Sequence, residues 1–135
     1  MAFRDAGWIQ IYAKNNQEVL DLTLMAFKIA EHKKIYLPVM VCLDGFILSH
    51  TSALVSIPKQ EQVDQFLKPF DPMIVLDPKK PFAHGALTHS NEMVGLRESL
   101  MQGFENAKII IPEVFKEYSK LVGRPFDGMI AKYGN

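Results

Sequence analysis

The chain has 135 residues, of which 48% are apolar and 22% are charged, and its 15 basic and 15 acidic side chains leave a formal net charge of zero. This composition is that of about one globular domain, and it excludes a disordered chain and a general nucleic-acid binder, which would need a basic surface. No apolar run approaches the about 20 residues that span a membrane, and no apolar secretion signal begins the sequence, so we expect a cytoplasmic protein without membrane contact. The single cysteine, Cys42, excludes an intramolecular disulfide and a four-cysteine zinc or iron–sulfur site within this chain.

The first part of the chain has the pattern of a βαβ unit. Residues 8–12 are rich in aromatic and β-branched side chains and predict a strand. Residues 17–31 follow two candidate caps, Asn15 and Asn16, and are apolar around most of their circumference, which indicates a helix buried between a sheet and another layer. Residues 36–43 are apolar without alternation, which is typical of a parallel strand covered on both faces.

Polar residues follow the second predicted strand, at the edge where open α/β sheets bind ligands. Asp44 and Gly45 are a common turn pair, so Asp44 either holds backbone amides in that turn or faces a cofactor pocket. Ser49 and His50 come next, and His50 could carry a proton near neutral pH, cap a helix or hydrogen-bond across an interface. We take Asp44, Ser49 and His50 as candidate cofactor-binding residues at a pocket edge, and we identify no catalytic candidate.

Residues 51–90 contain five of the eight prolines and predict an extended segment with one short helix over about residues 59–67. The apolar residues after that helix are too numerous for a solvated linker, so we expect an arm that lies on another surface. His84 and His89 lie in and near this segment without an evident third ligand, so no metal site is expected.

Helical periodicity returns at residue 91, where apolar residues begin to recur every three or four positions up to Leu121. This spacing predicts one long helix with a continuous apolar stripe. Pro112 removes a backbone donor and should kink or split the helix, and Gly123 suits the left-handed conformation that ends one. A coiled coil would have similar spacing, but the internal proline favours a helix that lies on a larger body.

The fold class expected from these elements is α/β. We expect a partial open parallel sheet over residues 1–50, the proline-rich arm over 51–90, and over 91–135 a long C-terminal helix, kinked near Pro112, with a link to a following domain. Two parallel strands do not make a stable sheet by themselves, and a central strand needs neighbours on both edges. The remaining strands are therefore expected on another chain or on the rest of a longer one.

One stretch is far more distinctive than a turn motif, namely Asp44-Gly45-Phe46-Ile47-Leu48-Ser49-His50-Thr51. Further distinctive segments are distributed over nearly the whole chain: residues 4–12, 16–18, 37–43, 57–58, 63–67, 76–78, 107–108 and 123–126. Together they resemble the α subunit of the pyruvate:ferredoxin oxidoreductases (pyruvate synthases), a branch of the 2-oxoacid:ferredoxin oxidoreductases. Ile47 and Thr51 stand where single-chain members often carry arginine and glutamate, which is nearer the multi-subunit type.

The resemblance implies the second part of the pyrimidine-binding domain of a thiamine-diphosphate enzyme. Such an enzyme oxidatively decarboxylates a 2-oxoacid, here expected to be pyruvate, passes electrons through iron–sulfur clusters to ferredoxin and transfers the acyl group to coenzyme A. It implies an oligomer with thiamine-diphosphate-binding, ferredoxin-like and γ-type subunits or domains, which carry Mg²⁺ and the clusters. Because the family's activating glutamate and diphosphate site lie outside this sequence, we expect the chain alone to bind no cofactor and to be inactive. The alternative is a non-catalytic assembly module from a truncated α subunit.

Overall fold

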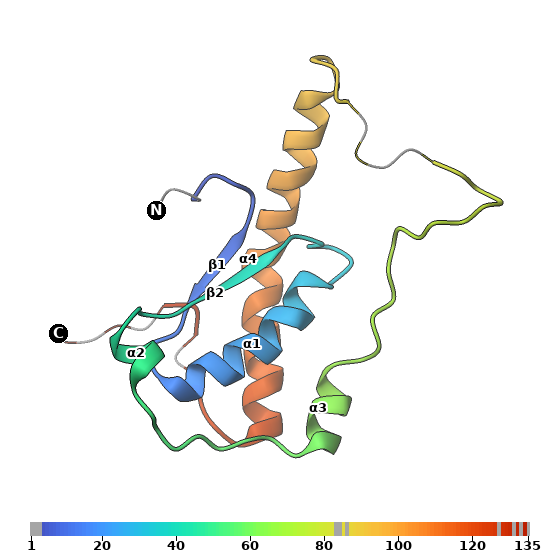
Figure 1. The fold of residues 1–135 in the computed structure, drawn as a ribbon. Coiled ribbons are helices and arrows are strands. Elements are labelled where there is room, and N and C mark those ends of the chain that lie inside the picture. The colour runs from blue at the N-terminus through green and yellow to red at the C-terminus, as the bar shows by residue number, and fades with distance from the viewer. Residues whose placement is uncertain are drawn as a thin grey trace.

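The computed structural model describes residues 4–82, 85, 87–126, 128–130, 132 and 134. Its elements follow in the order β1 (Ile9–Tyr12), α1 (Asn16–Ala30), β2 (Val39–Cys42), α2 (Ile47–His50), α3 (Gln60–Phe66) and α4 (Met93–Val122) (Figure 1). The predicted α/β class, with a parallel sheet and a long last helix, is confirmed. Among these described residues, no helix is both long enough and apolar enough to cross a membrane.

The two strands pair in parallel, and α1 connects them. The register places Ile9 opposite Val39. The second strand begins later than residue 36, where the sequence predicts it, because two residues disfavour the sheet. Tyr36 has a left-handed φ of 47°, and Pro38 has no N–H to donate, although its carbonyl oxygen accepts the Ile9 N–H at 3.0 Å.

Local sequence determines where α1 begins. The Asn15 side chain accepts a hydrogen bond from the Glu18 N–H at 2.8 Å, which satisfies one of the unpaired donors of the first turn. Asn16, the other candidate cap, is instead the first helical residue. The helix ends at Ala30, one residue before the predicted end.

The core lies between one side of the sheet, α1 and the C-terminal half of α4. Ile9 is buried in it, and Ile11, Val39 and Val41 pack against it. Ile35, which precedes β2, is also buried there. The helices contribute further large buried side chains: Leu22, Met25, Ile29, Phe66, Ile110, Ile111, Val114, Phe115 and Tyr118. The alternate strand residues, such as Met40, lie outside this core, so the described part of the chain supplies only one of the two layers expected around the sheet.

Pro112 does not divide the last helix, which is continuous from Met93 to Val122. The proline ring is exposed, and the carbonyl it leaves without a helical partner belongs to Lys108, which is also exposed, so that water can satisfy this group. The split considered for this position is therefore wrong, and the kink stays a prediction. Gly123 ends the helix in the left-handed conformation, with φ 67°, as predicted.

The apolar stripe of α4 is buried along only part of its length. Buried positions begin at Gly103, whereas the first turns expose Met93, Val94, Leu96 and Met101. In Figure 1 this end of α4 extends well beyond the sheet. The described residues thus leave the N-terminal part of the stripe uncovered.

The segment between α2 and α4 contains the one short helix that the sequence predicts. α3 spans Gln60–Phe66, within one residue of the predicted bounds, and Phe66 anchors it in the core against Tyr118 at a ring distance of 5.0 Å. The other described residues of this segment belong to no helix or strand, and in Figure 1 the chain runs away from the sheet after α3. Whether this segment is an arm on another surface stays a prediction.

Candidate functional site

The three candidate residues lie at the carboxyl edge of the sheet. Asp44 follows β2, and Ser49 and His50 are on α2, a short helix that the sequence did not predict. The start of α1 lies beside them (Figure 1), where Asn16 Nδ2 donates to the Thr51 carbonyl oxygen at 2.8 Å. All three candidate side chains are exposed at this edge, where parallel sheets bind ligands.

A strained turn brings two of the candidates together. Phe46 has φ 79° and ψ −62°, a conformation that costs a bulky residue about 1–3 kcal/mol. Its N–H donates to Ser49 Oγ at 2.9 Å, and this oxygen lies 2.8 Å from His50 Nδ1. Asp44 joins the turn through its carbonyl oxygen, which accepts the Ser49 N–H at 3.2 Å. His50 ends α2, so it does not cap the N-terminus of a helix.

The Ser49–His50 pair leaves one imidazole nitrogen for a ligand or a partner. Ser49 Oγ already accepts the Phe46 N–H, and its own proton is available for His50 Nδ1. In that arrangement the neutral ring carries its proton on Nε2, where it can donate a hydrogen bond. The turn can therefore offer a hydrogen-bond donor from His50 and an acceptor from the Asp44 carboxylate.

Two residues that sequence reasoning missed contact this region. The sequence explains Asn16 as a cap, yet its side chain holds the Thr51 carbonyl oxygen. Gln17 lies in one of the distinctive segments, but the sequence gives it no role; its side chain contacts both the N–H and the C=O of Ser56, at 2.6 and 3.1 Å. Both contacts join residues more than 30 positions apart in sequence, so no local pattern could have revealed them.

A buried polar network lies behind these two residues. The Asp21 side chain is only 1% exposed and accepts hydrogen bonds from Tyr118 Oη at 2.7 Å and Arg124 Nη2 at 2.6 Å. Burial, together with the adjacent Asp21 carboxylate, raises the pKa of the Tyr118 phenol well above its usual value. The network joins α1 to the end of α4 and serves the fold.

The residues present only partly fit the cofactor that the family resemblance implies. A diphosphate bound through Mg²⁺ needs several carboxylate or carbonyl oxygens around the metal. Within the described part of the chain, no three His, Cys, Asp or Glu side chains gather in a way that could hold a metal. His84 lies outside the described residues. Asp44, Ser49 and His50 could touch a cofactor at its edge, but they do not build a diphosphate–metal site.

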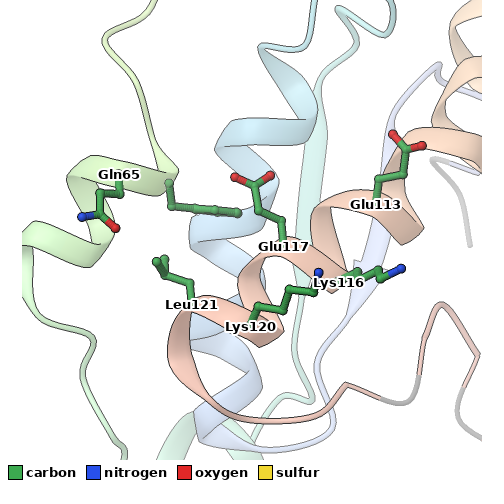
Figure 2. Close-up of a pocket in the computed structure, with 7 residues that line it drawn as sticks. Gln65, Glu113, Lys116, Glu117, Lys120 and Leu121 are labelled. Atoms are coloured by element: carbon green, nitrogen blue, oxygen red, sulfur yellow. The ribbon is translucent and has the colours of Figure 1, made fainter.

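Two hollows lie away from the candidate residues. The first, of about 590 Å³, lies between α3 and α4 and is lined by Gln65, Phe66, Leu121 and four charged residues of α4, namely Glu113, Lys116, Glu117 and Lys120 (Figure 2). Their charges cancel, and Glu117 pairs with Lys28 at 2.6 Å, so this hollow does not favour an ionic ligand. The second, of about 320 Å³, runs beside β1 and is lined largely by apolar side chains: Ile9, Ile11, Leu22, Ile111, Phe115, Phe126 and Met129.

Comparison with known proteins identifies related chains. Residues 1–116 match the family model described as "Pyruvate flavodoxin/ferredoxin oxidoreductase, thiamine diP-bdg". The chain is 41% identical over 133 residues to pyruvate synthase subunit PorA of Methanothermobacter thermautotrophicus, and 47% identical over 124 residues to PorA of Pyrococcus abyssi. It is 42% identical over 141 residues to the alpha subunit of NADH-dependent phenylglyoxylate dehydrogenase of Aromatoleum evansii.

These alignments cover 98%, 91% and 98% of this chain but only 34%, 31% and 34% of the respective relatives. The chain thus spans about a third of the length of the curated relatives it matches. Because the family model covers most of the sequence, the chain belongs to the thiamine-diphosphate-binding family of the pyruvate flavodoxin/ferredoxin oxidoreductases.

Proposed function

We propose that this chain is part of a thiamine-diphosphate-dependent pyruvate:ferredoxin oxidoreductase. The complete enzyme would convert pyruvate and coenzyme A into acetyl-CoA and CO₂ and pass the two released electrons to ferredoxin. The observation that carries this proposal is the 41–47% identity to pyruvate synthase subunits over nearly the whole chain. The relative that acts on phenylglyoxylate indicates that the same sequence framework accommodates other 2-oxoacids.

The structure supports a role within a larger assembly. The described residues form a sheet of two strands, and their surface carries many large apolar side chains, which is unusual for a monomer. The most exposed of these are Phe46, Ile47, Leu54, Ile57, Leu76, Leu87 and Ile130. We propose that these side chains are covered by other subunits or domains, of the thiamine-diphosphate-binding, ferredoxin-like and γ types. These partners would also supply the diphosphate site, Mg²⁺ and the iron–sulfur clusters. The chain alone would then be inactive.

Within this assembly, the three candidate residues would line the edge of the cofactor pocket. Asp44, Ser49 and His50 are exposed at the carboxyl edge of the sheet, and His50 has an imidazole nitrogen available for hydrogen bonding. Thiamine diphosphate would supply the electron sink for decarboxylation, and these residues would contact the cofactor at the edge of its pocket. We further propose that residues 1–50 belong to the pyrimidine-binding domain, 51–90 form a covering arm, and 91–135 lead to the next domain.

The assembled complex provides the test. Purified with its partner subunits, it should reduce ferredoxin when pyruvate and coenzyme A are both present and should form acetyl-CoA in proportion. Phenylglyoxylate and a branched-chain 2-oxoacid, tested in parallel, would reveal a different substrate preference. A complex that oxidises none of these acids, although it is fully loaded with thiamine diphosphate, would contradict the proposal.

A further inference from the structure

The segment that follows the candidate site is not held by packing. Residues 51–57 form the first part of the connection from α2 to α3, and all of their side chains are exposed, with Leu54 at 103% and Ile57 at 75%. A segment that buries no side chain gains little from the hydrophobic effect and would open easily. Something else must keep it beside the start of α1.

Hydrogen bonds from the start of α1 hold both ends of this segment. Asn16 Nδ2 donates to the Thr51 carbonyl oxygen at 2.8 Å. Gln17 Oε1 accepts the Ser56 N–H at 2.6 Å, and Gln17 Nε2 donates to the Ser56 carbonyl oxygen at 3.1 Å. Two adjacent helical residues thus bind backbone groups five positions apart.

The Gln17 side chain is itself held by the buried Asp21 carboxylate. Its Nε2 also lies 3.2 Å from each carboxylate oxygen of the buried Asp21, which Tyr118 and Arg124 hold in turn. Both protons and the oxygen of the amide therefore have partners. The contacts to Ser56 are anchored in the core rather than on a free surface side chain.

This anchoring matters because of what precedes Thr51. Phe46 holds a strained conformation, and such a conformation persists only where the surroundings maintain it. Ser49 and His50 lie directly between the strained residue and the bound Thr51. We propose that Asn16 and Gln17 are positioning residues that fix the Ser49–His50 turn at the cofactor edge. This role rests on the proposed function of that turn.

The test uses the assembled oxidoreductase and two pairs of matched variants. Asn16→Ala is compared with Asn106→Ala, because Asn106 Nδ2 also donates to a backbone carbonyl oxygen, that of Lys34 at 2.7 Å. Gln17→Leu is compared with Gln62→Leu, because Gln62 likewise bridges a backbone N–H and a backbone C=O, those of Lys59 and Leu121. Neither control residue contacts the candidate site.

One measurement tests whether Asn16 and Gln17 hold the segment, and a second tests whether they position the cofactor site. Hydrogen–deuterium exchange of the Thr51 and Ser56 N–H groups, which are hydrogen-bonded in the structure, should become about tenfold faster in Asn16→Ala and Gln17→Leu, because hydrogen bonds that close the segment are lost. The Kd of thiamine diphosphate, measured with Mg²⁺ by calorimetry, should rise about tenfold in the same variants, and both quantities should stay within about twofold in the controls.

Unchanged exchange in Asn16→Ala and Gln17→Leu would overturn the proposal. Faster exchange with an unchanged Kd would also overturn it, since these residues would then hold the segment without positioning the site. If the wild-type complex fails to bind thiamine diphosphate at all, the proposed function fails, and the exchange measurement alone decides whether Asn16 and Gln17 hold the segment.

Discussion

Gly103 lies on α4 where the helix packs closely against the chain that leads into β2. A Cβ atom at this position would lie 2.9 Å from Leu37 Cδ1 and 3.0 Å from the Ile35 carbonyl oxygen. The leucine methyl group can move, but the carbonyl oxygen belongs to the backbone and cannot move without shifting the chain. We therefore predict that Gly103→Ala destabilises the protein although alanine is the better helix former.

The magnitude follows from two opposing terms. Alanine in place of glycine inside a helix gains about 1 kcal/mol, whereas overpacking a core contact costs about 1–3 kcal/mol. The net loss for Gly103→Ala should be about 1 kcal/mol. Gly95, in the same helix, has no neighbouring atom within 4 Å of the point that a Cβ would occupy, so Gly95→Ala should gain up to about 1 kcal/mol.

Urea unfolding followed by the helical circular dichroism signal measures both variants against the wild-type chain. The two unfolding free energies should differ by about 2 kcal/mol, with the wild type between them. If Gly103→Ala were as stable as Gly95→Ala, the close contact between α4 and residues 35–37 would be refuted.

Three further predictions concern the buried network and the end of α4. Asp21→Asn should lower the unfolding free energy by about 3 kcal/mol, because it leaves Arg124 without its charged partner. The control Asp64→Asn, at an exposed position, should change the unfolding free energy by less than about 0.5 kcal/mol. Equal effects of the two variants in urea unfolding would argue against the network. Tyr118 has a raised pKa in the folded protein, so only the unfolded phenol ionises just above pH ~10, and stability should fall as the pH rises through that value by up to about 1.4 kcal/mol per pH unit. Tyr118→Phe should remove this slope in urea midpoints measured between about pH 9 and 11, and a slope that persists would assign it to other groups. Gly123→Ala should cost about 1 kcal/mol, because alanine is strained at φ 67°, and a thermal midpoint at or above the wild-type value would contradict the assigned helix end.

Local signals accounted for most of the elements. The Asn15 cap, the left-handed Gly123 and the short helix at 60–66 each depend on neighbouring residues, and each was predictable for that reason. The structure differs from the prediction where the backbone adopts a conformation that local propensity disfavours. α2 forms around the strained Phe46, a conformation that no propensity favours.

The candidate site shows the same division. Asp44, Ser49 and His50 could be selected because polar residues after a buried parallel strand must lie at the carboxyl edge of the sheet. The contacts that Asn16 and Gln17 make with Thr51 and Ser56, just after these residues, could not be predicted, because the partners are remote in sequence. The family resemblance added the chemistry, and the comparisons confirmed the family.

The sequence by itself determined that the chain is α/β and that its two predicted strands pair in parallel, connected by one helix. That these strands have further neighbours stays a prediction. The strand pattern, the apolar periodicity and the capping residues are properties of short segments. They can therefore be read from the sequence without knowledge of the tertiary contacts. Only the tertiary structure decided that the N-terminal part of the α4 stripe is uncovered, that Asp21 is buried with Tyr118 and Arg124, and that Gln17 holds Ser56. These features depend on which surfaces meet after the chain has folded, because residues remote in sequence can form contacts only once the fold brings them together.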